Sequence, residues 1–165
     1  MKYERGLTMN SPLGADARAI DVLEEFYRAE RIYMSAGGAL AGASFDEMGA
    51  TLDPNVILHQ SPDLPWGGDW IGYEGFKGWS IEMSRHWDIV DVQHPVFFEN
   101  ADQVVVLCQL VTRSRVTGET LDQPMAQVVT VKNGRITEFR AFYWHVPQYR
   151  AACRSEGGEA QEAQS

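Results

Sequence analysis

Two histidines and two tyrosines are the side chains of this sequence best suited to moving protons. His145 and His59 each end a predicted strand, and Tyr143 precedes His145 by two positions. An unperturbed imidazole titrates at about 6.5, so either histidine could take and return a proton at neutral pH. Tyr143, or Tyr27 on the first predicted helix, could donate to a developing enolate oxygen. This set of residues predicts general acid–base catalysis on a small molecule.

The last predicted strand would place two of these groups on one wall. Its period-two pattern sends alternate side chains to opposite faces. One face, apolar at depth and polar at its end, carries Phe139, Ala141, Tyr143 and His145. That order is typical of a blind pocket with a titratable group at its rim. The alternative is that His145, just before Pro147, is exposed to solvent.

Three further polar positions leave alternatives open. His59 is predicted to face the pocket as the group complementary to His145, but a slip of one residue would put Gln60 inside instead. Asp122, near a strand start, is expected to lie opposite His145 and to orient its imidazole. Glu30 lies on or near the apolar stripe of the first helix, where we expect it to face solvent or pair with a neighbouring arginine.

Tryptophans are concentrated in the middle of the chain, and four of the five lie between positions 66 and 87. They favour a flat, apolar or aromatic ligand. Trp66 and Trp70 are predicted to form a lid over the pocket. Helical spacing puts Trp79, Met83 and Trp87 on one side of a helix that would cover it.

The order of the elements indicates an α+β domain. A helix starting near Asp16, a short helix after Ser44, a strand at 56–60 and a helix at 73–87 come first. Strands at 90–99, 103–114, 120–131 and 135–146 follow, joined by short turns. Helices followed by an antiparallel meander predict three N-terminal helices on one face of a curved sheet. We expect one domain over residues 15–153, with flexible tails at 1–14 and 154–165.

Composition excludes several classes of protein. The net charge of −9 argues against nucleic-acid binding, and no apolar run is long enough to span a membrane. Without a signal core near the N-terminus, a cytoplasmic location is expected, with Cys108 and Cys153 reduced. The four histidines share no ligand spacing, so neither a metal nor another cofactor is expected.

Three stretches carry a resemblance to a known superfamily: residues 52–62 (LDPNVILHQSP), 64–76 (LPWGGDWIGYEGF) and 134–145 (GRITEFRAFYWH). With the order of elements, they resemble the nuclear transport factor two-like superfamily, and within it the SnoaL-like and ketosteroid-isomerase-like branch. The resemblance implies a cone-shaped half-barrel with one deep pocket, and it likens Tyr27 to the tyrosine that isomerases supply from the first helix. Many relatives have Asp where this chain has His145, and the isomerase oxyanion carboxylate would fall near Ala126.

The resulting hypothesis is a cofactor-independent enzyme that cyclises, isomerises or dehydrates a small hydrophobic, polycyclic or polyketide-like metabolite. Its expected substrate contacts are Trp66, Trp70, Trp79, Met83, Trp87, Ala126, Phe139 and Ala141. Two alternatives remain: a non-catalytic ligand-binding or assembly domain, and an epoxide hydrolase of the same fold. A homodimer is expected through the outer face of the sheet, where Gln127, Val129, Arg140, Phe142 and Trp144 are predicted to lie.

Overall fold

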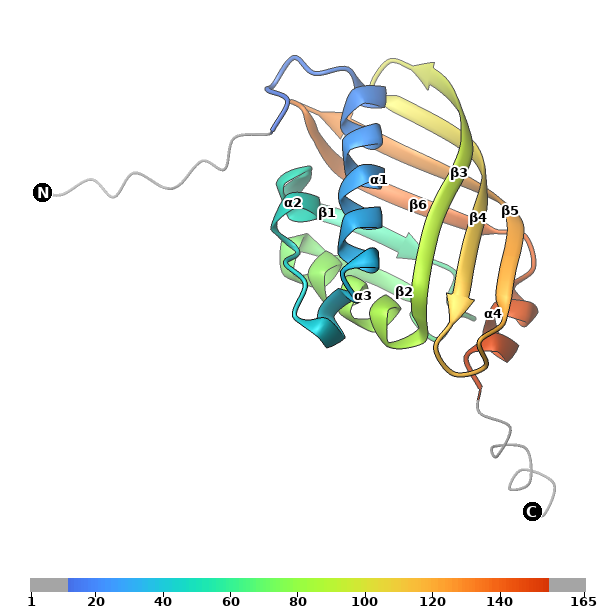
Figure 1. Ribbon diagram of the computed structural model, residues 1–165. Coiled ribbons are helices and arrows are strands. Elements are labelled where there is room, and N and C mark those ends of the chain that lie inside the picture. The colour runs from blue at the N-terminus through green and yellow to red at the C-terminus, as the bar shows by residue number, and fades with distance from the viewer. Residues whose placement is uncertain (1–11, 155–165) are drawn as a thin grey trace, which may run out of the picture.

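The computed structural model describes residues 12–154 and shows helices packed on one side of a curved, unclosed six-stranded sheet (Figure 1). This is the α+β architecture that the order of elements predicted. The elements are α1 (Ala19–Ser35), the 3₁₀ helix η1 (Gly38–Ala41), α2 (Asp46–Ala50), β1 (Leu52–Gln60), β2 (Gly68–Ile71), α3 (Gly72–His86), β3 (Trp87–Asn100), β4 (Gln103–Ser114), β5 (Thr120–Lys132), β6 (Arg135–Tyr143) and α4 (Val146–Ala152). The tails predicted at 1–14 and 154–165 lie almost entirely outside the described residues.

The strands follow the order β2-β1-β6-β5-β4-β3. Strands β3 to β6 form the predicted antiparallel meander, whereas β1 pairs with β6 in parallel. The carboxyl ends of β1 and β6 therefore lie at the same end of the sheet. Between β5 and β6, Asn133 and Gly134 both have positive φ, at 52° and 70°. This is the conformation that a two-residue Asn-Gly hairpin favours.

Alternation along the strands defines an inner face, covered by α1 and α3, and an outer face. Even-numbered residues of β4, such as Val104 and Val106, are buried, and so are odd-numbered residues of β5, such as Val129. On α1 the predicted stripe is buried at Leu23 and Tyr27. One hydrophobic core lies between the helices and the inner face.

Several boundaries differ from those predicted. Helix α1 begins at Ala19 after Arg18, whose side chain makes no capping hydrogen bond, rather than after Asp16. The loop before α3 contains the short strand β2, paired with β1. Strand β6 ends at Tyr143, and α4, which was not predicted, follows with Pro147 in its first turn, a position that proline favours. No helix among residues 12–154 is long and apolar enough to cross a membrane.

Candidate functional site

A small internal cavity of about 20 Å³ lies between α1, α3 and the inner face of the sheet. It has room for about one water molecule, which requires roughly 10–15 Å³. Its walls are mostly apolar, with a few polar groups from α1, α3, β1, β5 and β6. The lining residues are Phe26, Glu30, Gln60, Trp79, Met83, Val90, Val92, Leu110, Met125, Gln127, Phe139, Ala141 and Tyr143.

Glu30 is the only carboxyl group among the residues that line this cavity. Its exposed fraction is 8%, and it makes no hydrogen bond or ion pair within residues 12–154. Burial raises the pKa of Glu30 to about 8, and Asp91 adds to this effect. Arg31, whose Nε lies 2.9 Å from Asp91 Oδ1, lowers the pKa of Glu30, but this is the smallest of the three effects. A carboxyl group that titrates near neutral pH can both give and take a proton.

Burial of Glu30 is the main site feature that the sequence interpretation missed. We expected it to face solvent or pair with an arginine. Its position on α1, three residues after Tyr27 and four before Met34, was the available evidence, because that spacing puts all three on one helix face.

Tyr143 supplies an O–H group to the same cavity. Its oxygen accepts a hydrogen bond from Trp66 Nε1 at 3.2 Å, so its own proton is left for another partner. Burial raises the pKa of Tyr143 well above its ordinary value, which keeps the hydroxyl protonated at neutral pH. Tyr27 differs, because its hydroxyl proton is donated to Gln127 Oε1. Tyr27 therefore holds an amide of the lining in place.

Two polar atoms of the cavity lining have no hydrogen-bond partner in the described part of the chain. They are Gln60 Oε1, an acceptor, and Trp79 Nε1, a donor. Both residues are 6% exposed. Leaving such a buried atom unpaired costs roughly 1–3 kcal/mol. Together with Glu30 and Tyr143, the lining therefore offers donors and acceptors to a bound molecule.

The remaining residues expected to contact substrate fall into two groups. Trp79, Met83, Phe139 and Ala141 line the cavity. Trp66 and Trp87 do not line the cavity. Their rings pack edge to face against each other, with centroids 5.6 Å apart, and Tyr149 of the unpredicted α4 contacts both rings. Trp70 donates from Nε1 to the Trp66 carbonyl at 3.1 Å. The predicted lid is therefore part of a packed aromatic wall.

The predicted position of His145 on the pocket wall was wrong. Because β6 ends at Tyr143, the period-two pattern does not extend to residue 145. His145 is exposed and stands at the N-cap of α4, where its Nδ1 accepts from the Gln148 backbone N–H at 3.2 Å. Asp122 is exposed on the outer face and makes no hydrogen bond to His145 in the described structure. The expected pairing of these two residues was also wrong.

The face of β1 was the open question, and the structure puts Gln60 inside and His59 outside. The His59 ring lies between two carboxylates, with Nδ1 2.7 Å from Asp69 Oδ1 and Nε2 2.8 Å from Glu138 Oε1. His59 thus joins β2, β1 and β6 on the outer side. No group of three or more His, Cys, Asp or Glu side chains among residues 12–154 could hold a metal ion.

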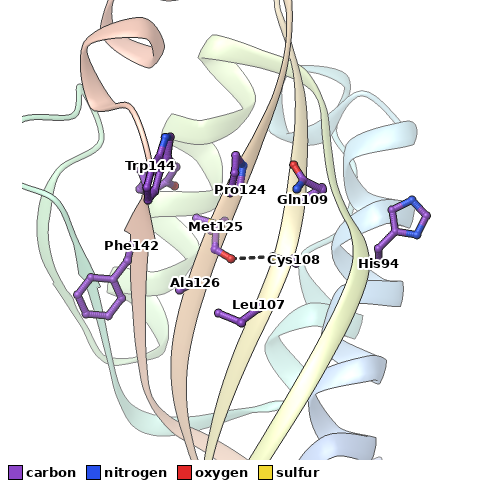
Figure 2. Close-up of a pocket in the computed structure, with 10 residues that line it drawn as sticks. His94, Leu107, Cys108, Gln109, Pro124, Met125, Ala126, Phe142 and Trp144 are labelled. Atoms are coloured by element: carbon purple, nitrogen blue, oxygen red, sulfur yellow. Dashed lines mark hydrogen bonds between the residues drawn. The ribbon is translucent and has the colours of Figure 1, made fainter.

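The faces predicted for Ala126, Gln127 and Val129 on β5 were also wrong. Met125 pairs with Tyr143 and Cys108, both on the inner face, so Gln127 and Val129 point inward and Ala126 points outward. Ala126 lines an outer pocket of about 570 Å³ (Figure 2). Its apolar wall includes Leu107, Pro124, Phe142 and Trp144, with His94 and Gln109 at one side.

Comparison with known families identifies the fold of this site. A model of the SnoaL-like domain matches residues 29–139, most of the chain. The chain belongs to the SnoaL-like domain family. Solved structures similar to this SnoaL-like domain show the same fold, and comparison with curated proteins gave no match.

Three of these structures illustrate the range of the fold. A nuclear transport factor two-like protein of unknown function from Burkholderia pseudomallei is 17% identical (TM-score 0.68; 84% of this chain and 99% of that chain). A proposed polyketide cyclase from Pseudomonas putida is 14% identical (TM-score 0.66; 84% and 99%). A hypothetical protein with a ketosteroid isomerase-like fold from Catenulispora acidiphila, in complex with trimethylamine, is 16% identical (TM-score 0.60; 77% and 92%).

Proposed function

We propose that this SnoaL-like domain is a cofactor-independent enzyme that moves a proton on a small carbonyl compound, with Glu30 as the acid–base group. The observation that carries the proposal is the isolation of Glu30. Its carboxyl group is buried, has a pKa of about 8, and forms no ion pair with any of residues 12–154. It borders a cavity in which two polar atoms have no hydrogen-bond partner in that part of the chain. Structural ion pairs do not explain such a group, and perturbed carboxyl groups in cavities are typical of active sites.

The surrounding groups suit enolisation. Deprotonated Glu30 would take a proton from the carbon next to a carbonyl, and protonated Glu30 would return it to another atom. The negative charge that develops on the carbonyl oxygen would be stabilised by the hydroxyl of Tyr143 and by Trp79 Nε1, two donors that line the cavity. Aldol cyclisation, double-bond isomerisation of an unsaturated ketone and dehydration of a β-hydroxy ketone can each begin with such a step.

The cavity also restricts the reacting part of the substrate. No Lys, Arg or His side chain is among the residues that line it, so an anionic group would face Glu30 without a counter-charge. Its volume admits only a few atoms unless flexible side chains such as Met83 and Met125 move. We therefore infer an uncharged reacting end. The similarity to a proposed polyketide cyclase is compatible with such chemistry.

Deuterium exchange tests the proposal without knowledge of the natural substrate. We expect the protein in D₂O to catalyse exchange at the α-carbons of small ketones, measured by proton NMR, and the rate to rise with pH and level off above about 8. Glu30→Gln should reduce the catalysed rate by roughly 10²–10⁴-fold. Glu24→Gln, on the exposed face of the same helix, is the matched control. A catalysed rate that survives Glu30→Gln would refute the assignment.

A second candidate function, assembly through the outer face, is favoured by a different observation. Trp144 is 77% exposed, Phe142 51% and Leu107 48%, and the three line one outer pocket. Exposed apolar patches of this kind often mark interaction surfaces. We propose that two copies associate here, burying these side chains. Trp144→Asp should then convert a dimer to a monomer in sedimentation experiments. A wild-type protein that stays monomeric at high micromolar concentration would rule this out.

A further inference from the structure

The ends of β1 and β6 enclose a second, larger pocket that opens to the surface. Its volume is about 440 Å³, against about 20 Å³ for the internal cavity. Gln60, Ala141 and Tyr143 line both. The parallel pairing of β1 with β6 explains the arrangement, because the carboxyl ends of both strands lie at this end of the sheet. The surface pocket and the cavity are therefore separated by a shared wall of three side chains.

One of the three shared side chains is less firmly held than the others. The hydroxyl of Tyr143 is held by Trp66 Nε1, and Ala141 has no rotatable side chain. Gln60 has a flexible side chain, and its Oε1 forms no hydrogen bond within residues 12–154. Rotation of Gln60 would therefore break no hydrogen bond at that oxygen. It is the side chain whose movement would connect the two spaces.

The charged groups of the surface pocket are not equally available to a ligand. Asp69 is bound to His59 at 2.7 Å, and the other nitrogen of His59 is bound to Glu138. Arg140 makes one long contact, from Nη2 to Glu138 Oε1 at 3.4 Å, and its side chain is 49% exposed. A guanidinium has five N–H donors, so most of those of Arg140 are free to bind an anion.

We propose that the surface pocket is the outer half of the substrate site, where Arg140 binds the anionic body of a keto acid whose uncharged carbonyl end passes Gln60 to reach Glu30. This inference rests on the proposed function for the role of Glu30. It explains how a cavity that admits only a few atoms can act on a larger substrate, because only the carbonyl end of the ligand needs to enter it. The substrate class is thus a molecule with a neutral carbonyl end and a carboxylate or similar anion several bonds away.

Two probes of matched shape test this inference. 4-Oxopentanoate carries the ketone and the carboxylate, and 5-methyl-2-hexanone replaces the carboxylate with an isopropyl group of similar shape. We expect the protein to bind 4-oxopentanoate about tenfold more tightly, as a charge-assisted hydrogen bond provides. Arg140→Gln should abolish the preference. Arg18→Gln removes the same charge beyond the opposite end of β6, in a separate pocket, and should leave the preference intact.

Intermolecular NOEs would locate the two ends of the bound probe. The ketone methyl group of 4-oxopentanoate should contact the Trp79 ring, and the methylene next to the carboxylate should contact the Arg140 side chain. Equal binding of the two probes, a preference that survives Arg140→Gln, or a ketone methyl that contacts no cavity residue would each overturn the inference.

The deuterium-exchange rates separate this inference from the proposed function. If wild-type protein exchanges neither probe but keeps a preference that depends on Arg140, the proposed chemistry fails and the two-part binding site stands. If it exchanges both probes equally and binds them equally, the chemistry of Glu30 stands and the outer half of the site fails.

Discussion

The two faces of the sheet differ in whether their titratable side chains have ion-pair partners. On the outer face, the ring of His59 lies between two carboxylates, with Nδ1 2.7 Å from Asp69 and Nε2 2.8 Å from Glu138. On the inner face, Glu30 forms no ion pair with any residue among 12–154, and its pKa is raised to about 8. Paired surface charges mainly stabilise the fold, whereas an unpaired buried carboxyl group destabilises it and can do chemistry. Glu30, the proposed acid–base group, is thus a carboxyl group whose hydrogen-bonding capacity residues 12–154 leave unused.

The pH dependence of stability is the largest effect expected from this contrast. The ordinary carboxyl pKa of 4.5 applies to the unfolded chain, and the folded value is about 8. Between these values the folded state holds a proton that the unfolded chain has lost, so stability falls as pH rises, by about 1.4 kcal/mol per pH unit from this group. Relative to Glu30→Gln, wild-type protein should lose on the order of 3 kcal/mol between pH 5 and pH 8.

Urea denaturation of both proteins at several pH values measures this difference directly. Glu24→Gln, with an exposed side chain, should follow the wild-type curve. If the free energy of unfolding depends on pH in the same way for wild type and Glu30→Gln, the pKa of Glu30 is not raised. The contrast between the two faces would then be lost.

The two tyrosines of the inner face differ in whether the hydroxyl proton is already donated to a partner. Tyr143→Phe keeps the ring contacts with Trp66 and Tyr149 but removes the proposed donor to the enolate. We expect the exchange rate of small ketones to fall about a hundredfold, the usual effect of losing one oxyanion donor. Tyr27→Phe, whose hydroxyl is already bound to Gln127, should reduce the rate less. If both variants lose activity equally, Tyr143 has no special role.

A smaller effect is expected at the paired charges of the outer face. His59→Leu leaves Asp69 and Glu138 without the imidazole between them, and should cost about 1 kcal/mol of unfolding free energy, as partly exposed ion pairs do. High salt should reduce the difference, because it screens exposed charges. The exchange rate of a neutral ketone, which does not use Arg140, should change only slightly. A loss of this exchange as large as that of Glu30→Gln would show that the exchange step itself needs His59.

The smallest effect is expected at His145. Its imidazole is exposed and caps the short α4, so His145→Ala should cost roughly 1 kcal/mol or less, and His145→Asn, which also caps helices, should cost less still. Neither should alter the rate of deuterium exchange. A collapse of that rate in His145→Ala, with Glu30→Gln still active, would reverse the assignment of the acid–base group.

Much of the fold could be predicted because its cues are local. The Asn133-Gly134 hairpin, the stripe on α1 and the alternation along β6 from Phe139 to Tyr143 all depend on neighbouring residues. Alternation, however, says only which side chains share a face. It does not say which face is covered, and the predicted faces of Ala126 and Gln127 were wrong for that reason. The end of β6 was misplaced because α4 packs Tyr149 against Trp66 and Trp87, a contact between distant parts of the chain.

The helix stripes, the strand periods and the SnoaL-like family could be recognised from the sequence alone, because each depends on short-range patterns of side chains. Which titratable group is removed from water depends instead on the packing of distant segments. Burial depends on what packs over a residue, and the cover over Glu30 comes from α3 and from strands far along the chain. The same packing left His59 and His145 outside the cavity, although the sequence alone had made them the first candidates for catalysis.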